Sequence, residues 1–466
     1  MKIGIVVHGP NIIDSGYALK IINILKNFGE VSCRLGGTMG RTAVIDASLE
    51  NLIDISAKRL PSGSVKLFLK ENVDIIVLLN YGKSSVTGHT FGFKVFKNSF
   101  FDDIFKSKIN RKSIDFIQIE RPGEVDGNVI HWIGNNNDLT LKLAKLLDLN
   151  ILNPQKIINE YFKDDLDTFK GINSENIVNT LDTNYNSNNK DKNDINKHNI
   201  NKNIEKIRNI HGVSPNENIF VNGIVVGKSK SEKLVLVSKN DEIIDIIGGE
   251  IKSHGVEKLG PIDIDKAIVK TGLLRRTNPE PRIIVNVSNS DNNIDNIGIN
   301  DVNGGNRSNN DYLNVAFVDH AAEDIYNLKD VDLVVTIGDD TTLVASDILY
   351  RFNIPVIGIT DGDLDKVVEK GYITDGSTVI ELKSGLDDIV GNSIFKNLFN
   401  SEYYLKLPIV MEDNYNFENN DYNKHIKSKI FEDFKKEVFE IVNNICPREY
   451  YKFKYYNKQN NEYEKI

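Results

Sequence analysis

The sequence predicts an α/β protein with parallel, doubly wound sheets, a small β-rich module and two Asn-rich inserts. Three observations carry this prediction. Near both ends of the chain, short apolar runs alternate with helix-patterned stretches, as in parallel sheets covered by helices. A central region has short strand candidates separated by Asn-Gly and Asn-Asp pairs, which indicate hairpins. Two further stretches consist mainly of Asn and other polar residues, a composition typical of disorder.

Residues 1–170 are predicted to form an N-terminal α/β domain. Its strand candidates are the runs KIGIVV, EVSCRL, VDIIVLL, IDFIQIE and NVIHWIG. Apolar residues recur at helical spacing over residues 17–28, so a helix is predicted there. This alternation of strands and helices favours a doubly wound, Rossmann-like sheet.

The rest of the chain changes character several times. We predict a disordered Asn-rich insert at 171–203, a small β-rich module at 204–284, a second disordered insert at 285–312, a C-terminal α/β domain at 313–400, and a helical extension with a tail at 401–466. Within the module, residues 262–274 are predicted to form a covering helix. In the extension, residues 426–445 are predicted to form an amphipathic helix, and an exposed tail follows it.

Composition limits the partners of the protein. The net charge of −9 and the pI of about 5.5 argue against broad electrostatic binding to nucleic acid. No apolar stretch approaches the ~20 residues of a membrane span. The two cysteines, Cys33 and Cys446, are too few for a disulfide framework or a cysteine zinc site. We therefore expect a cytoplasmic protein with buried or incidental thiols, whose oligomeric state the sequence leaves open.

Two acidic turns follow consecutive apolar runs in the C-terminal domain. Residues 333–337 end at the turn GDDTT, residues 338–342, and residues 355–359 end at the turn TDGDLD, residues 360–365. One βαβ unit would bring both turns to the carboxyl edge of a parallel sheet, where ligands bind. Clustered carboxylates suit Mg²⁺, which in turn suits phosphate chemistry. The predicted metal ligands are Asp339, Asp340 and Asp363, and the predicted proton acceptor is Asp361 or Asp363.

The same turns have a purely structural interpretation. Asp and Gly favour turns, and Asp340, Thr341 or Thr342 would serve as the N-cap of the helix that follows. In that case the carboxylates only cap helices. The pairing of two acidic clusters at one sheet edge favours the metal or phosphate site over this alternative.

The segment 333–365 resembles the phosphofructokinase pattern, and its first turn resembles that of the NAD kinase and diacylglycerol kinase superfamily. This resemblance implies that Gly338, Asp339 and Thr341 contact phosphate or metal, and that Asp361 or Asp363 is the catalytic base. Thr342, in the same turn, is assigned to phosphate as well. The chain departs from the pattern at Ile337, which replaces a glycine, and the second turn is one residue shorter.

Glycine-rich turns in the N-terminal domain offer a second place for an anion. Gly36, Gly37 and Arg41 follow the second strand and would bind phosphate through backbone N–H groups and a guanidinium. Lys83, after the third strand, is also predicted to bind phosphate or a nucleotide, although the glycine spacing around it does not match a P-loop. A plain glycine-rich connection is the alternative. In the module we interpret Arg275 and Arg276 as part of a solvated charged face, with anion binding as the alternative.

Over nearly its full length the chain resembles a family of methanogenic archaea that carries a domain of unknown function. The resemblance rests on VVHGPNIIDSG, LGGTMGRT, FVNGIVVGK, HGVEKLG, TIGDDTT and GITDGDLD. It implies no activity.

These observations support one leading hypothesis and two alternatives. The leading hypothesis is a Mg²⁺-dependent, phosphotransferase-like enzyme that acts on a nucleotide or a phosphorylated metabolite. The first alternative is a non-catalytic protein that binds such a ligand through its glycine-rich turns. The second is a nucleic-acid enzyme similar to the Toprim group, which the acidic charge balance disfavours.

Overall fold

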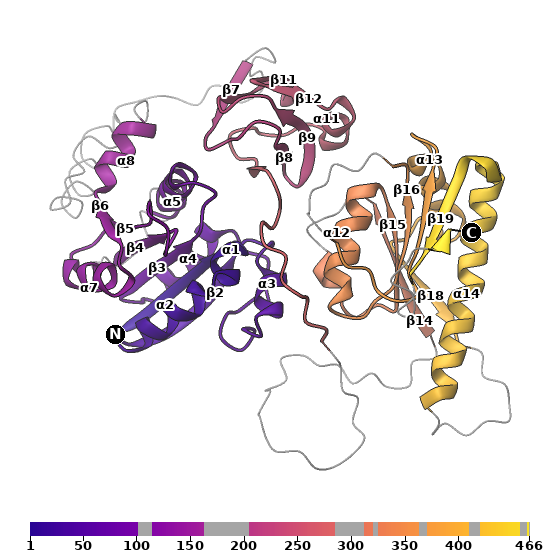
Figure 1. Cartoon of the computed structure of the whole chain (residues 1–466), viewed down its shortest axis with the longest axis horizontal. Coiled ribbons are helices and arrows are strands. Elements are labelled where there is room, and N and C mark those ends of the chain that lie inside the picture. The colour runs from indigo at the N-terminus through magenta and orange to yellow at the C-terminus, as the bar shows by residue number, and fades with distance from the viewer. Residues whose placement is uncertain are drawn as a thin grey trace, which may run out of the picture. The chain divides into compact units, whose positions relative to one another are not determined.

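The computed structural model describes residues 1–100, 114–162, 205–284, 312–319, 325–362, 371–409, 420–456 and 464–465. The chain forms two compact units, Met1–Glu280 and Pro281–Ile466, and each is considered by itself (Figure 1). The predicted insert 171–203 and almost all of the predicted insert 285–312 lie outside the described residues. The mixed α/β class with parallel strands is confirmed.

The first unit contains a six-stranded sheet in the order β2-β1-β3-β4-β5-β6. The first four strands along the chain are parallel, β5 runs antiparallel to β4, and β6 runs parallel to β5. The strands are β1 Lys2–His8, β2 Glu30–Gly36, β3 Ile75–Asn80, β4 Asp115–Glu120, β5 Asn128–Ile133 and β6 Asn150–Leu152. Every residue of β3 and β4 is buried, as expected for strands covered on both faces.

Helices connect and cover these strands. They are α1 Asn11–Asp14, α2 Tyr17–Lys26, α3 Arg41–Asp46, α4 Pro61–Lys70, α5 Ser85–Phe100, α7 Asn137–Leu147 and α8 Pro154–Tyr161. The core under α4 and α5 is aromatic, and Phe93 and Phe96 of α5 pack near Trp132 of β5, at ring-centroid distances of 6.0 and 5.6 Å. Gly88 and Gly92 let α5 approach β4, because a Cβ on either would meet the side chain of Glu120 or Gln118.

Two small antiparallel sheets build the predicted β-rich module, in the orders β11-β10-β7 and β12-β9-β8-β13. The strands are β7 Glu205–Ile210, β8 Asn218–Val221, β9 Ile224–Ser229, β10 Leu234–Lys239, β11 Glu242–Ile247, β12 Gly249–Ile251 and β13 Val269–Thr271. The predicted hairpins are confirmed. Asn222-Gly223 and Asn240-Asp241 have positive φ at both positions, the conformation that matches the twist of hairpin strands.

The helix predicted over residues 262–274 is wrong. The helix of the module is α11, Ser253–Leu259, and the predicted segment contains β13 instead. The guanidinium of Arg208 donates hydrogen bonds to the carbonyl oxygens of Ile264 and Ala267, at 2.5 and 2.6 Å. These bonds satisfy carbonyl groups that would otherwise accept hydrogen bonds within a helix.

The second unit is built on a seven-stranded sheet in the order β18-β14-β15-β16-β17-β19-β20. Strands β14 to β17 are parallel, and β18 and β19 run antiparallel on either side. The strands are β14 Tyr312–Asp319, β15 Leu333–Ile337, β16 Val356–Thr360, β17 Thr378–Leu382, β18 Tyr404–Pro408, β19 Tyr451–Tyr455 and β20 Glu464–Lys465. Residues 451–455 thus extend the sheet, although the sequence predicted an exposed tail there.

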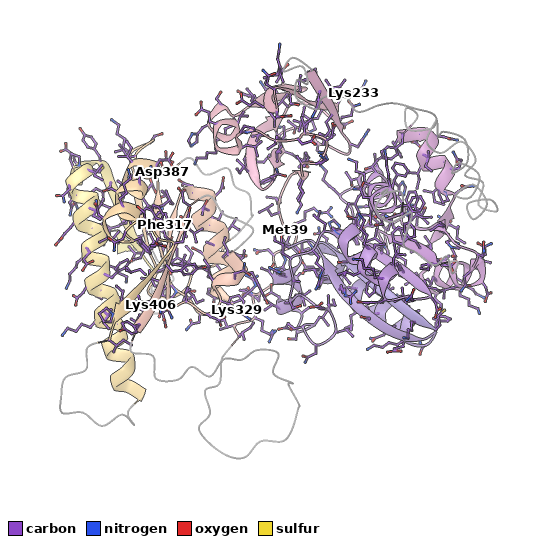
Figure 2. The ribbon with its side chains drawn as sticks, turned by 180° about the vertical axis from the view of Figure 1, so that it is seen from behind. Met39, Lys233, Phe317, Lys329, Asp387 and Lys406 are labelled. Atoms are coloured by element: carbon purple, nitrogen blue, oxygen red, sulfur yellow. The ribbon has the colours of Figure 1, made fainter. Side chains whose placement is uncertain are left out.

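Helices cover both faces of this second sheet (Figure 1). They are η2 Ile325–Leu328, α12 Asp339–Tyr350, α13 Asp387–Asn397, α14 Asn420–Ile445 and η3 Arg448–Tyr450. Phe434, Val438 and Val442 of α14 are buried in the core with α13 and the strands. Phe317 of β14, labelled in Figure 2, packs against two phenylalanines of the α13 region in the same core.

Neither cysteine is in a disulfide, and both are buried, as the sequence predicted. None of the helices in the described ranges combines the length and the apolar composition that a membrane crossing requires.

Close packing of α5 on β4 gives a stability prediction. In Gly92→Ala the new Cβ would lie 1.7 Å from Gln118 Oε1, so the buried hydrogen bonds of Gln118 must break or shift. We expect a loss of about 1–3 kcal/mol in the free energy of unfolding. The measurement is urea unfolding followed by fluorescence of Trp132, the single tryptophan of the chain, which is buried in this unit.

The matched control is Gly63→Ala in helix α4, where no atom lies within 4 Å of an added Cβ. This variant should gain about 0.5–1 kcal/mol from the better helix propensity of alanine. Equal effects of the two substitutions would contradict the packing argument.

Candidate functional site

Polar groups of the second unit gather where β15 and β16 end. The N–H of Gly338 donates to the carbonyl of Ile359 at 2.8 Å, which holds the two strand ends together. Gly338 has a φ of +92° and precedes α12 without a side-chain cap. A residue other than glycine is strained in this conformation. The first turn of α12 therefore points its N–H groups out from the carboxyl edge of the sheet.

The two predicted acidic turns are in direct contact. Asp339 Oδ2 accepts hydrogen bonds from the N–H groups of Asp361 and Gly362, at 2.9 and 3.1 Å. Asp361 Oδ2 in turn accepts one from the N–H of Gly385, at 2.7 Å. The other oxygen, Asp361 Oδ1, is buried and has no hydrogen-bond partner within the described residues. Such an atom loses its hydration without compensation unless a proton, water or cation reaches it.

The remaining predicted residues of this edge fall into three groups. Thr341 lies beside Gly338, and Asp340 lies in the first turn of α12. Thr342 is buried, and its hydroxyl lies 2.8 Å from the Thr336 hydroxyl on the face of the sheet. Its methyl group fills the space that the glycine at position 358 leaves open. Asp363 lies outside the described residues.

A cation at this edge would have few protein ligands. Among the described residues no group of three or more His, Cys, Asp or Glu side chains could hold a metal ion. Mg²⁺ commonly takes only one or two carboxylates and completes its coordination with phosphate and water. Asp339 fits that pattern as a single carboxylate ligand, whereas a closed, all-protein metal site does not fit the described residues.

The first unit has a second polar edge, at the carboxyl end of its sheet. The chain adds β2 on one side of β1 and then β3 on the other side, so the direction of strand addition reverses between β1 and β3. This is the position where open α/β sheets bind ligands. The last residues of these two strands, His8 and Asn80, are register partners. Their side chains are joined by a hydrogen bond of 2.7 Å between His8 Nδ1 and Asn80 Oδ1.

The hydrogen-bond chain continues from Asn80 to a buried carboxyl group on β4. Asn80 Nδ2 donates to Glu120 Oε2 at 2.7 Å, and Gln118 Nε2 donates to the same oxygen at 2.8 Å. The N–H of Gly82 donates to Glu120 Oε1 at 2.6 Å. Trp132 Nε1 donates to Gln118 Oε1 and fixes that amide. Glu120 is fully buried, so its position depends on these donors.

Two titratable groups belong to this chain of hydrogen bonds, Glu120 and His8. Burial shifts the pKa of each in the direction that favours its neutral form. It raises the pKa of Glu120 to about 7, although the donors from Asn80, Gly82 and Gln118 act against it. Burial also lowers the pKa of His8 to about 4, although the hydrogen bond to Asn80 acts in the opposite direction. His8 is therefore neutral near pH 7 and stacks on Phe91, with ring centroids 4.0 Å apart.

The predicted glycine-rich turn lies beside His8. A Cβ on Gly37 would lie 3.7 Å from His8 Cδ2, and Gly37 has a φ of +95°. Gly36 ends β2 with too little space for a side chain. Arg41 is buried at the start of α3. Lys83 forms an ion pair with Glu217 of the β-rich module, so its charge is balanced within the protein.

Arg275 does not belong to a solvated face, which corrects the interpretation of the sequence. Its guanidinium donates two hydrogen bonds to Asp14, at 2.6 and 2.8 Å, and one to Asp46, at 2.7 Å. All three side chains are largely buried. The next residue, Arg276, donates to the carbonyl of Tyr81 at 3.0 Å. No local pattern in the sequence could reveal these contacts, because the partners lie 195–261 residues away.

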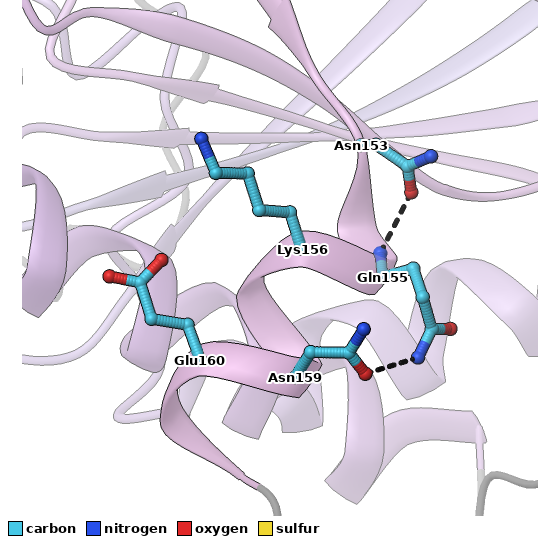
Figure 3. Close-up of a pocket in the computed structure, with 5 residues that line it drawn as sticks. All are labelled: Asn153, Gln155, Lys156, Asn159 and Glu160. Carbon is cyan, nitrogen blue, oxygen red and sulfur yellow. Dashed lines mark hydrogen bonds between the residues drawn. The ribbon is translucent and has the colours of Figure 1, made fainter.

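One shallow pocket lies along α8, as Figure 3 shows, and is lined by Asn153, Gln155, Lys156, Asn159 and Glu160. All five residues come from one short segment. Their amides hydrogen-bond within it, from the N–H of Gln155 to Asn153 and from Gln155 Nε2 to Asn159. The pocket contains none of the residues that the sequence predicted, and three of its five lining residues hydrogen-bond to one another.

The fold and its two polar edges define an α/β protein with two units, each centred on a sheet that contains parallel strands. The chain belongs to the family described as an uncharacterized protein conserved in archaea (DUF2117), whose sequence profile matches residues 5–402. It is 40% identical over 409 residues to an uncharacterized protein of Methanocaldococcus jannaschii, an alignment that covers 86% of this chain and 93% of the relative. No solved structure matches it. The predicted resemblance to an archaeal family of unknown function is confirmed.

Glu120 gives a pH-dependent prediction. An unfolded glutamate has a pKa of 4.5 and the folded one about 7, so between these values the folded state holds a proton that the unfolded chain has lost. Stability should therefore fall as the pH rises through this window, by up to about 3 kcal/mol. Glu120→Gln should remove this fall. The measurement is urea unfolding by Trp132 fluorescence below about pH 5 and above about pH 8.

Glu250→Gln, at a largely exposed carboxylate of the same unit, is the control and should leave the pH dependence unchanged. His8 acts in the opposite sense, since its folded pKa lies below its ordinary value of 6.5, so only the difference between wild type and variant isolates Glu120. The prediction would be contradicted if the free energies of unfolding of wild type and Glu120→Gln differed by the same amount at both pH values.

Proposed function

We propose that this protein binds a nucleotide or a phosphorylated metabolite together with Mg²⁺ at the acidic edge of the second unit, in a phosphotransferase-like reaction. The single observation that carries this proposal is the contact between the two acidic turns. Asp339, the first residue of α12, accepts hydrogen bonds from the turn after β16, so both carboxylates border the start of α12. A helix start with exposed N–H groups attracts phosphate.

Each group at this edge would have a separate task. The N–H groups at the start of α12 would bind a phosphate oxygen, and Asp339 would hold the cation beside it. When bound, Mg²⁺ neutralises charge on the phosphate groups. Asp361 Oδ1, which is buried and unpartnered within the described residues, would accept the proton of an attacking hydroxyl group. Because phosphoryl transfer depends mainly on positioning and charge stabilisation, these few groups are sufficient.

A non-catalytic binding protein is the second candidate, and one observation favours it. Asp339 and Asp361 each use an oxygen to accept main-chain N–H groups, so both carboxylates also hold the turns in place. If this is their main contribution, the edge would bind the ligand without transferring phosphate.

Two finer features of the fold are part of the proposal. The reversal of strand addition between β1 and β3 supports a doubly wound, Rossmann-like first sheet. The two buried free thiols support a protein of the cytoplasm, where thiols stay reduced.

Calorimetric titration of the full chain with ATP and with GTP, in the presence and absence of Mg²⁺, tests the proposed function. We expect binding that requires Mg²⁺. Asp339→Asn keeps an oxygen that accepts the N–H of Asp361 but removes the negative charge, so it should weaken Mg²⁺-dependent binding by roughly tenfold or more. Release of phosphate from the bound nucleotide separates the enzyme from the non-catalytic binding protein.

Asp330→Asn is the matched control. Asp330 is exposed and precedes β15, so it lies at the opposite end of the same strand and should leave binding unchanged. If neither nucleotide binds to the wild type, the proposal is wrong. If Asp339→Asn binds as tightly as the wild type, the acidic edge is not the site.

A further inference from the structure

The hydrogen-bond chain of the first sheet determines which nitrogen of His8 carries the proton. An ionised Glu120 can only accept hydrogen bonds. Asn80 must therefore turn its NH₂ group toward Glu120 and its carbonyl oxygen toward His8. That oxygen needs a donor, so the proton of the neutral imidazole lies on Nδ1. The other nitrogen, Nε2, is left with a lone pair.

His8 Nε2 lies beside Gly37, at the carboxyl edge of the first sheet. It has no hydrogen-bond partner within the described residues, since the single hydrogen bond of the side chain is made by Nδ1. A Cβ on Gly37 would lie 3.9 Å from it, and Gly37 leaves this space open. His8 thus presents a fixed acceptor beside the glycine-rich turn, at the position where strand addition reverses.

Arg276 brings a positive charge to the same edge of the first sheet. We call the region that contains His8, Gly37 and Arg276 the corner. Its guanidinium donates to the carbonyl of Tyr81, the residue after Asn80. With the Asn11 amide oriented so that its oxygen faces Arg276, that oxygen accepts two more bonds, at 3.1 and 3.3 Å. Both acceptors are neutral. No carboxylate in the described part of the chain forms an ion pair with Arg276. Burial and Arg121 lower the pKa of Arg276, although Tyr81, Glu120 and Glu124 act in the opposite direction.

The two arginines have different tasks. Arg275 is neutralised by Asp14 and Asp46, and these ion pairs hold the segment against α1 and α3. Arg276 is held in place because Arg275, the residue before it, is anchored by these ion pairs. The charge of Arg276 itself is not balanced by an ion pair. A partly buried cation without a counterion is unfavourable unless an anion joins it. The corner therefore combines one fixed hydrogen-bond acceptor with one cation that lacks a paired anion.

We propose that this corner is a second ligand site, in which Arg276 binds the phosphate or carboxylate group of a small metabolite while His8 Nε2 accepts a hydrogen bond from an O–H or N–H group of that metabolite. The site lies wholly in the first unit. It is therefore independent of the acidic edge of the second unit and does not rest on the function proposed for that edge.

Nitrogen NMR of the full chain labelled with ¹⁵N-histidine tests both halves of the proposal. The eight histidines are assigned by substitution, and the His8 signals are those lost in His8→Gln. Near pH 8, where Glu120 is ionised, His8 should show a protonated Nδ1 and an unprotonated Nε2. Addition of inorganic phosphate or of malate, each of which carries an O–H group at this pH, should then shift the Nε2 signal. The probe that acts identifies the anionic group as phosphate or carboxylate.

Variants locate the response. Arg276→Gln should weaken the apparent affinity of the active probe roughly tenfold or more. Lys266→Gln removes one positive charge from an 86% exposed side chain of the same unit and should change little. Asp339→Asn, in the second unit, should leave the His8 response intact even if the acidic edge also binds phosphate. Trp132 fluorescence confirms that the first unit, which contains His8, is folded in each variant.

Three results would overturn the proposal. The first is a His8 whose proton lies on Nε2. The second is a wild-type His8 signal that responds to neither phosphate nor malate, which needs no variant to interpret. The third is a response that survives unchanged in folded Arg276→Gln.

Discussion

The constraint on which both polar edges depend is the burial of parallel strands on their two faces. A strand covered on both sides has to be apolar along most of its length, and β3 follows this rule with five aliphatic residues before Asn80. In β3 the one polar side chain, Asn80, lies at the point where the strand leaves the sheet. Because parallel strands end at one edge, the polar residues of β1, β3 and β4 meet there, as do those of β15 and β16.

Glu120 is a carboxyl group buried at this edge, and neighbouring groups stabilise it by hydrogen bonds. A buried carboxylate is unfavourable without donors, and here three groups donate to it. Gly82 and Gly88 leave the space that the carboxyl group fills. These two glycines therefore allow the backbone to pack closely around the carboxyl group of Glu120. The network also passes along the sheet, because Gln118 and Asn80 each have one remaining polar group, and these bind Trp132 and His8.

Features that depend on neighbours in sequence were predictable, and features that depend on distant partners were not. Apolar runs gave most strands of the two large sheets, and Asn-Gly and Asn-Asp pairs gave the module's hairpins, because turn conformation is set locally. The helix predicted over residues 262–274 failed because Arg208, more than fifty residues earlier, takes carbonyl groups that a helix would use. Likewise, the charge pattern of Arg275 could not reveal its burial against Asp14.

The sequence predicted that the two acidic turns lie together. It could not tell whether their carboxylates only hold the turns in place or also bind a ligand. The structure shows why the two tasks are compatible. A carboxylate has two oxygens with about four acceptor positions, and Asp361 uses only Oδ2 to hold the N–H of Gly385. Its Oδ1 is buried and unpartnered within the described residues. The hydrogen bond to the main chain fixes where this second oxygen lies, so holding the turn uses one oxygen of the carboxylate and does not exclude a ligand at the other.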